Sequence, residues 1–124
     1  MLLRSEGALA NIDMIKQWIV NQCGCSLANA SQACNDILVH PGDVESGGGH
    51  PIGWTTMRCT VGNALRRVYH ASAGRTGGTT CTIFFVEHPD NICHIVALGN
   101  HTGPSSYGIV YMKACWTYGN NVNL

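Results

Sequence analysis

The chain has 124 residues, of which 45% are hydrophobic and 11% charged, and its formal net charge at pH 7 is zero. This length suits one domain with a real core, and the apolar content excludes a disordered chain. No apolar run approaches the roughly 20 residues that span a membrane, and the opening Met1-Leu2-Leu3-Arg4 turns polar too early for a signal peptide. We therefore expect a single domain over residues 1–124 with no membrane partner.

The charges are divided unevenly along the chain. Residues 1–57 hold two basic and five acidic side chains, a net −3, and residues 58–124 hold five basic and two acidic ones, a net +3. A positive second half is typical of a site for a polyanion. The excess is small beside the many phosphate contacts that dominate nucleic-acid affinity.

Seven cysteines are an odd number, so they cannot all form disulfides within one chain. We expect thiols that are reduced and mostly buried, with one disulfide and leftover thiols as the alternative. Cys23-Gly24-Cys25 lacks the C-x₂₋₄-C spacing of zinc sites. The sequence therefore predicts neither a metal nor another cofactor.

Two helices are predicted near the start of the chain. Apolar residues recur at helical spacing over Ala8–Val20, and Gly24 ends this segment. A second apolar stripe predicts a helix over Ser26–Leu38, with Ser26 as its N-terminal cap.

A loop rich in glycine and proline follows over residues 40–54, and a loop of this length is often mobile or functional. Val61, Ala64, Leu65 and Val68 then predict a short helix over Thr60–Arg67. The remaining apolar runs, separated by polar turns, predict an antiparallel meander. Its four strands are Val68–Ala73, Cys81–Val86, Ile92–Leu98 and Tyr107–Met112.

These elements predict an α+β fold, in which N-terminal helices (about residues 8–38) pack on a four-stranded antiparallel β-meander (about 68–116). Alternation along the strands predicts that Tyr107, Ile109 and Tyr111 share a face. It places His94 and His101 on opposite faces unless a bulge intervenes, for which Gly99 is a candidate.

One end of the meander gathers residues suited to acid–base chemistry. His101 and Tyr107 flank a short connection, so hairpin pairing would bring them together. His70 is on a strand of the same meander, and Arg75 is in the loop that follows this strand. Histidine, tyrosine and arginine could cleave an RNA phosphodiester without a metal, because a base takes the 2′-hydroxyl proton, a cation stabilises the phosphate and an acid protonates the leaving oxygen.

A second enzyme class remains open. Cys25 precedes a predicted helix, whose N-terminus would lower a thiol pKa, and His94 lies on a strand. This order is typical of a small papain-like cysteine hydrolase of the toxin or amidase type, with Asn100 as the candidate orienting residue. A non-enzymatic binding module is the third possibility, since the neutral charge and the cysteine-rich core suffice for one.

The C-terminal half resembles RelE-type ribonuclease toxins, which belong to the wider group of barnase, colicin-type and RelE-type RNases. The resemblance covers roughly residues 60–112 and rests on Tyr69-His70, Gly74-Arg75, Gly99-Asn100-His101 and Tyr107. Two features depart from the family: the chain is neutral, and His70 and Thr80/Thr82 stand where the family often has arginines.

The resemblance implies an endoribonuclease whose catalytic residues are His101, Tyr107, Arg75 and His70. It also implies an RNA substrate and a cognate immunity or antitoxin protein. The expected location is the cytoplasm of the producing or target cell, or secretion as part of a larger effector. The departures favour an interbacterial toxin over one that cleaves messenger RNA on the ribosome.

Overall fold

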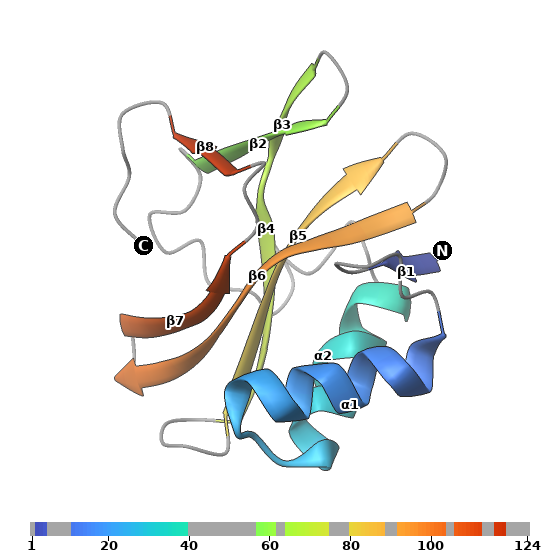
Figure 1. The fold of residues 1–124 in the computed structure, drawn as a ribbon, viewed down its shortest axis with the longest axis vertical. Coiled ribbons are helices and arrows are strands. Elements are labelled where there is room, and N and C mark those ends of the chain that lie inside the picture. Colours follow the sequence, from blue (N-terminus) through green and yellow to red (C-terminus); the bar gives the residue numbers. More distant parts are fainter. Residues whose placement is uncertain are drawn as a thin grey trace.

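A computed structural model describes residues 2–4, 11–39, 57–61, 64–74, 80–88, 92–103, 106–112 and 116–118. Within these ranges two helices pack on a large sheet, and a small second sheet lies at the other end of the molecule (Figure 1). The predicted α+β fold, with N-terminal helices on an antiparallel sheet, is confirmed.

The first helix, α1 (Ile12–Cys23), is defined at both ends by local hydrogen bonds. The Asn11 side chain accepts from the backbone N–H groups of Asp13 and Met14, and Gly24 adopts the left-handed conformation that ends the helix. The predicted end at Gly24 is confirmed, while residues 8–10 of the predicted helix lie outside the described residues.

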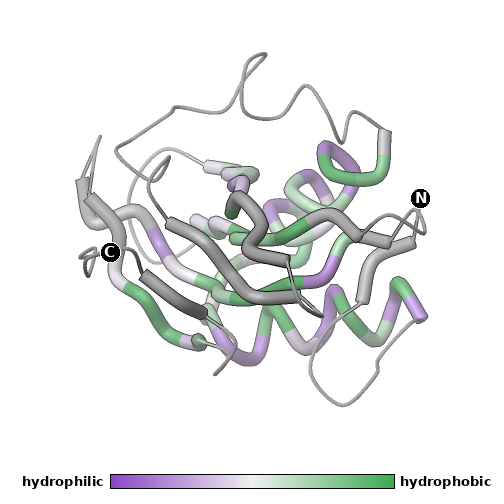
Figure 2. Tube along the Cα trace, turned by 90° about the horizontal axis from the view of Figure 1, so that it is seen from above, coloured by the Kyte–Doolittle hydropathy of each residue, from purple (hydrophilic) through white to green (hydrophobic). Residues whose placement is uncertain are grey.

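The second helix, α2 (Leu27–Val39), begins at the predicted cap. The Ser26 hydroxyl accepts a hydrogen bond from the backbone N–H of Asn29 at 3.1 Å. Hydrophobic and hydrophilic residues alternate along both helices (Figure 2), and Ile15, Ile19 and Ile37 are fully buried against the sheet.

The large sheet contains the predicted meander: β4 (Tyr69–Ala73), β5 (Cys81–His88), β6 (Ile92–Gly103) and β7 (Ser106–Met112) pair in chain order, all antiparallel. A further strand, β1 (Leu2–Arg4), pairs in parallel with the first residues of β6. This strand lies on the same edge of β6 as β7, beside the opposite end of β6 (Figure 1).

The small sheet replaces one predicted helix. Strands β2 (Met57–Val61) and β3 (Ala64–Arg67) form an antiparallel hairpin, and β8 (Trp116–Tyr118) pairs with the other edge of β2. The predicted helix over Thr60–Arg67 is therefore wrong, because Met57–Val61 and Ala64–Arg67 are paired antiparallel strands in which Val61 and Ala64 are direct partners. The glycine-rich loop predicted over residues 40–54 lies outside the described residues.

A bulge midway along β6 shifts the alternation of its side chains, so residues beyond the bulge face the side opposite to the one that simple alternation predicts. Phe84 pairs with Ala97 and Phe85 with Ile95, so Val96 is an extra residue on β6. Both Ile95 and Leu98 consequently face the helices and belong to one core with Ile83 and Phe85. Ala97 takes the opposite face, where it is also fully buried.

A second bulge changes a predicted face of β7. Leu98 pairs with Tyr111 and Gly99 with Ile109, which leaves Val110 without a partner on β6. Tyr111 therefore turns toward α1 and packs edge-on against Trp18, with ring centroids 4.9 Å apart. The prediction that Tyr111 shares a face with Tyr107 and Ile109 is wrong, because Val110 shifts the alternation.

Within the described residues, no helix has the length and apolar character needed to cross a membrane.

Candidate functional site

The end of the β6–β7 hairpin brings His101 and Tyr107 together in register. Their Cα positions are direct partners, followed by the pair Gly103 and Ser106 at the end of the hairpin. Direct partners of an antiparallel pair have Cβ atoms about 4.5–5.5 Å apart and lie on the same face. The pairing predicted from the short connection is thus present in the backbone.

A close approach of β6 and β7 sets this register. A Cβ atom on Gly99 would stand 2.8 Å from the Gly108 carbonyl oxygen and 3.3 Å from Ile109 Cδ1. Both atoms belong to the facing strand, so only a residue without a side chain fits between them. Gly99 therefore fixes the position of the hairpin end that carries His101.

Gly74 and Thr80, the described residues that flank Arg75 in the sequence, lie at the same end of the sheet. Gly74 lies beside Thr80, because a Cβ on Gly74 would come within 3.2 Å of the Thr80 Cα. Since Thr82 pairs with Gly99, continuing the register by two residues places Thr80 beside His101. Arg75 itself lies outside the described residues. Its chain neighbour Gly74 directly follows β4, the strand that pairs with β5, and lies beside Thr80.

Asn100 joins this end of the sheet to α1. Its side-chain Nδ2 donates to the carbonyl oxygens of Cys23 at 3.1 Å and of Thr80 at 2.7 Å. The Cys23 carbonyl belongs to the last turn of α1 and has no acceptor role inside the helix, so the amide supplies the missing donor. Asn100 is thus a structural anchor, and not the orienting residue of a catalytic pair.

His70 is not brought to this site. It is 2% exposed, pairs with Phe84 on β5, and its ring lies 6.2 Å from the Phe84 ring. Gly74 marks the end of the sheet near His101, and it lies four residues from His70, about 13 Å along the strand. The predicted catalytic role of His70 does not fit this position, because a proton donor must come within hydrogen-bond reach of the substrate.

The candidate cysteine–histidine pair is separated by the sheet. Cys25 is buried in the core beneath the helices, together with Cys93 and Ile95 of β6. His94 stands between those two residues, so it takes the opposite face of the strand. Burial also raises the pKa of the Cys25 thiol, an effect strengthened by the nearby Cys23. The geometry thus does not assemble a papain-like nucleophile.

The predicted bulge between His94 and His101 is present at Val96, before the candidate position Gly99. It places positions 94 and 101 on the same side of the sheet. They are nonetheless roughly 20 Å apart along β6, too far for one site.

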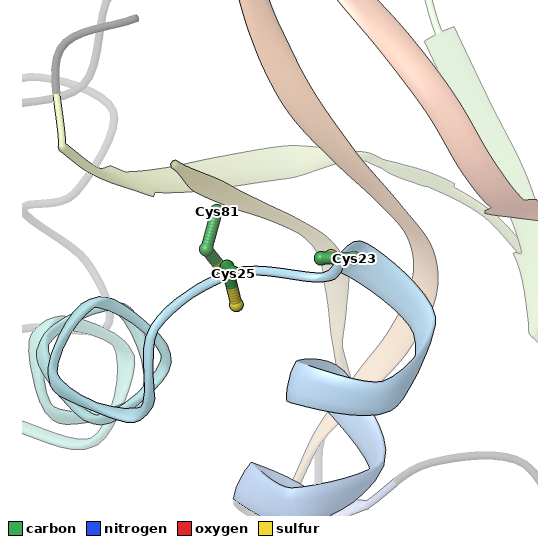
Figure 3. A group of neighbouring side chains, drawn as sticks. All are labelled: Cys23, Cys25 and Cys81. Carbon is green, nitrogen blue, oxygen red and sulfur yellow. The ribbon is translucent and has the colours of Figure 1, made fainter. Parts of the chain in front are cut away.

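Three cysteine thiols meet where α1, α2 and β5 converge. The sulfur atoms of Cys23, Cys25 and Cys81 all lie within 4.8 Å of one another (Figure 3). All three residues are buried, and the described cysteine side chains form no disulfide. The sequence alone does not reveal this cluster, because Cys81 is distant in sequence and Cys23-Gly24-Cys25 is a weak signal by itself.

The thiols of Cys23 and Cys81 have pKa values shifted in opposite directions. A hydrogen bond with the Cys81 thiol lowers the pKa of Cys23 despite its burial. The same hydrogen bond and burial raise the pKa of Cys81. The hydrogen bond thus links the titration of the Cys23 and Cys81 thiols.

Comparison of the chain with protein-family models, curated proteins and solved structures finds no match. The site must therefore be interpreted from its own geometry.

Proposed function

We propose that this protein is a metal-independent endoribonuclease toxin of the RelE-like kind. The observation that supports the proposal best is the direct pairing of His101 with Tyr107 at the end of the β6–β7 hairpin. The strand that carries Tyr107 borders solvent, since Val110 and Met112 are 43% and 44% exposed. A long polymer could reach such an edge more easily than a closed pocket.

The proposed reaction is transesterification at an RNA phosphodiester. A base removes the proton of the 2′-hydroxyl, and the resulting oxygen attacks the adjacent phosphorus. The bond to the 5′-oxygen breaks as an acid protonates that oxygen, which leaves a 2′,3′-cyclic phosphate. His101 acts as the general acid or base, and Tyr107 positions the base or assists the proton transfer.

Arg75 is the proposed partner of the phosphate. The support for this role is that Gly74, its neighbour in the chain, lies at the same end of the sheet as His101. A guanidinium group offers two parallel hydrogen bonds to the phosphate oxygens, which carry most charge in the transition state. The net +3 charge of residues 58–124 agrees with an anionic substrate.

A toxin of this kind acts on RNA in the cytoplasm of the producing or target cell. We therefore also propose a cognate immunity or antitoxin protein that keeps the producing cell alive. Delivery as part of a larger secreted effector is consistent with the same function.

The test is cleavage of total RNA by the purified chain in the presence of a chelator. Because general acid–base groups contribute about 10²–10⁴-fold each, His101→Ala should reduce the cleavage rate by that factor. His88→Ala is the matched control. His88 is the last residue of β5 and pairs with Ile92, the first residue of β6, so it lies at the end of the sheet far from His101. Wild-type cleavage by His101→Ala, or complete loss of wild-type cleavage in chelator, would contradict the proposal.

The arginine can be tested in the same assay. Arg75→Lys should recover only part of the rate lost in Arg75→Ala, because a point charge cannot reproduce the planar fork of the guanidinium. Equal rates for Arg75→Lys and the wild type would show that only the positive charge at position 75 matters, and not the two parallel hydrogen bonds of the guanidinium. Cys25→Ala should cleave normally, and its inactivity with an intact fold would favour the cysteine hydrolase instead.

A further inference from the structure

The cluster of Cys23, Cys25 and Cys81 takes no part in the proposed RNA chemistry. These residues lie on the helix side of the sheet, and their exposed fractions are 8%, 5% and 0%. Figure 3 shows Cys23 at the end of α1, Cys25 in the α1–α2 connection and Cys81 on β5. Three separate elements thus direct soft sulfur donors toward one point.

Several contacts hold the three donors in place. Gly24, in its left-handed conformation, turns the chain sharply between Cys23 and Cys25. Ser26 then caps α2, which fixes the residue after Cys25. Asn100 holds the Cys23 carbonyl, and the Cys23 sulfur lies 3.8 Å from the Gly99 carbonyl oxygen. Rigid supports of this kind position ligands for a metal without large rearrangement.

The spacing and the chemistry of the sulfurs match a trigonal metal site. Sulfur–metal bonds of about 2.3 Å put three sulfurs of a planar site about 4 Å apart, compatible with the observed upper limit of 4.8 Å. Thiolate ligands select soft cations such as Cu(I), whereas structural zinc takes four ligands. Among the described residues, no fourth cysteine, histidine or carboxylate completes the group.

We propose that Cys23, Cys25 and Cys81 form a buried site for a soft, thiophilic cation, and that this cation is Cu(I). Each thiol that becomes a ligand forms a sulfur–copper bond and releases its proton to solvent. Copper remains Cu(I), and no electron is transferred. Full coordination consumes three thiols and releases three protons, so affinity should rise with pH.

The titration is performed anaerobically on the reduced full chain. The two cysteines whose side chains lie outside the described residues, Cys59 and Cys115, are first replaced by alanine to remove background binding. Cu(I) is supplied from a competing chelator, and thiolate-to-copper absorption in the ultraviolet is recorded. We expect one equivalent of Cu(I), with an affinity that increases between neutral and mildly alkaline pH.

Variants locate the bound copper. Cys25→Ala should weaken binding by more than about 100-fold, the upper end of what removal of a mere supporting partner costs. Cys93→Ala is the matched control, because Cys93 is equally buried in the same core but is not part of the group. It should bind copper with wild-type affinity. If Cys25→Ala does not fold, as judged by circular dichroism, Cys25→Ser answers the same question with almost unchanged volume.

Three results would overturn the proposal. The first is no binding of either Cu(I) or Zn(II), which would show that the cluster is only a packed core of thiols. The second is tighter binding of Zn(II) than of Cu(I), which would make the copper assignment wrong. The third is unchanged copper affinity in both Cys25 variants. Since the assay does not depend on RNA cleavage, its outcome and that of the ribonuclease test are independent.

Discussion

Near the end of β6, the two faces of the sheet serve different roles, although the residues that define them, Asn100 and His101, are adjacent in the chain. Asn100 faces the helices, and its amide donates to two backbone carbonyls, of Cys23 and Thr80. His101, the next residue, pairs with Tyr107 at the hairpin end, and β7 exposes Val110 and Met112 farther along the strand. One side is fixed by hydrogen bonds and buried sulfur, and the other carries the residues of the proposed chemistry.

This contrast shows how a single strand can separate stability from activity. Because side chains alternate across a strand, neighbouring residues experience different surroundings at almost the same position along it. Substitutions at positions 100 and 101 should therefore affect different measurements.

A strongly destabilising change is expected at Asn100. Asn100→Leu removes both donated hydrogen bonds and leaves the carbonyls of Cys23 and Thr80 without this partner. Each of these partly buried hydrogen bonds contributes about 0.5–1.5 kcal/mol, so the free energy of unfolding should fall by about 1–3 kcal/mol. Urea denaturation measures it, with His101→Ala as the comparison at about 0.5 kcal/mol or less. Similar losses in both variants would refute the proposed division of the strand.

Gly99→Ala should disturb both sides, because the new methyl group would stand 2.8 Å from the Gly108 carbonyl oxygen. Overpacking of this kind costs about 1–3 kcal/mol. The displaced hairpin should also slow any cleavage that depends on His101. Gly24→Asn is a suitable control, since nothing lies within 4 Å of the added Cβ and asparagine tolerates the left-handed conformation. A Gly99→Ala protein of wild-type stability would show that the strands can separate freely.

Alkaline pH should destabilise the helix side through Cys34. Burial raises the pKa of this thiol from 9.0 to about 12. Above pH 9 the unfolded chain loses this proton while the folded protein keeps it, so stability falls as pH rises. The slope is about 1.4 kcal/mol per pH unit for one group, and it ends near the folded pKa.

Thermal or urea unfolding between pH 8 and about 10.5 checks the slope. Cys34→Ala should reduce the pH dependence while leaving RNA cleavage at neutral pH unchanged. An identical pH dependence in the wild type and in Cys34→Ala would assign the effect to other groups.

The cap of α2 makes a smaller contribution. Ser26→Ala loses the hydrogen bond from the Asn29 N–H and should cost about 1 kcal/mol. Ser26→Asp should retain most of the stability, because a carboxylate also accepts from that position and favours a helix N-terminus. A loss for Ser26→Asp as large as for Ser26→Ala would mean that the cap is not the cause.

The smallest effect concerns the redox state. We expect thermal unfolding to occur at the same midpoint with and without a reducing agent, because the described cysteine side chains are free thiols. A structural disulfide would contribute about 2–4 kcal/mol. A fall in the midpoint of more than roughly 10 °C in reductant would therefore reveal a disulfide that supports the fold.

Local signals in the sequence predicted much of this architecture. Ser26 and Gly24 mark helix ends through their own backbone chemistry, and polar turns separate the strands of the meander. The pairing of His101 with Tyr107 followed from the short connection between them. The α2 cap, the α1 end and the meander all depend on residues close together in sequence.

The errors have physical causes. The apolar residues Val61, Ala64, Leu65 and Val68 have the spacing of a helix. The dipeptide Gly62-Asn63 among them is a hairpin signal, which outweighs that spacing. The extra residues Val96 and Val110 shift the side-chain alternation in the rest of their strands, and no local sequence pattern predicts either bulge. The thiol cluster depends on contacts between distant segments, and the burial of His70 depends on packing that strand alternation alone does not reveal.

The parallel pairing of β1 with β6 has a consequence for the order of folding. Leu2 pairs with Ile92, a contact that closes a loop of roughly 90 residues, whereas the meander strands pair with near neighbours. Because loop closure costs entropy before distant contacts form, the meander can assemble early and β1 docks late. Amide hydrogens of β1 should accordingly exchange with solvent faster than those of β5, and the first residues of the chain should detach before the rest of the sheet opens.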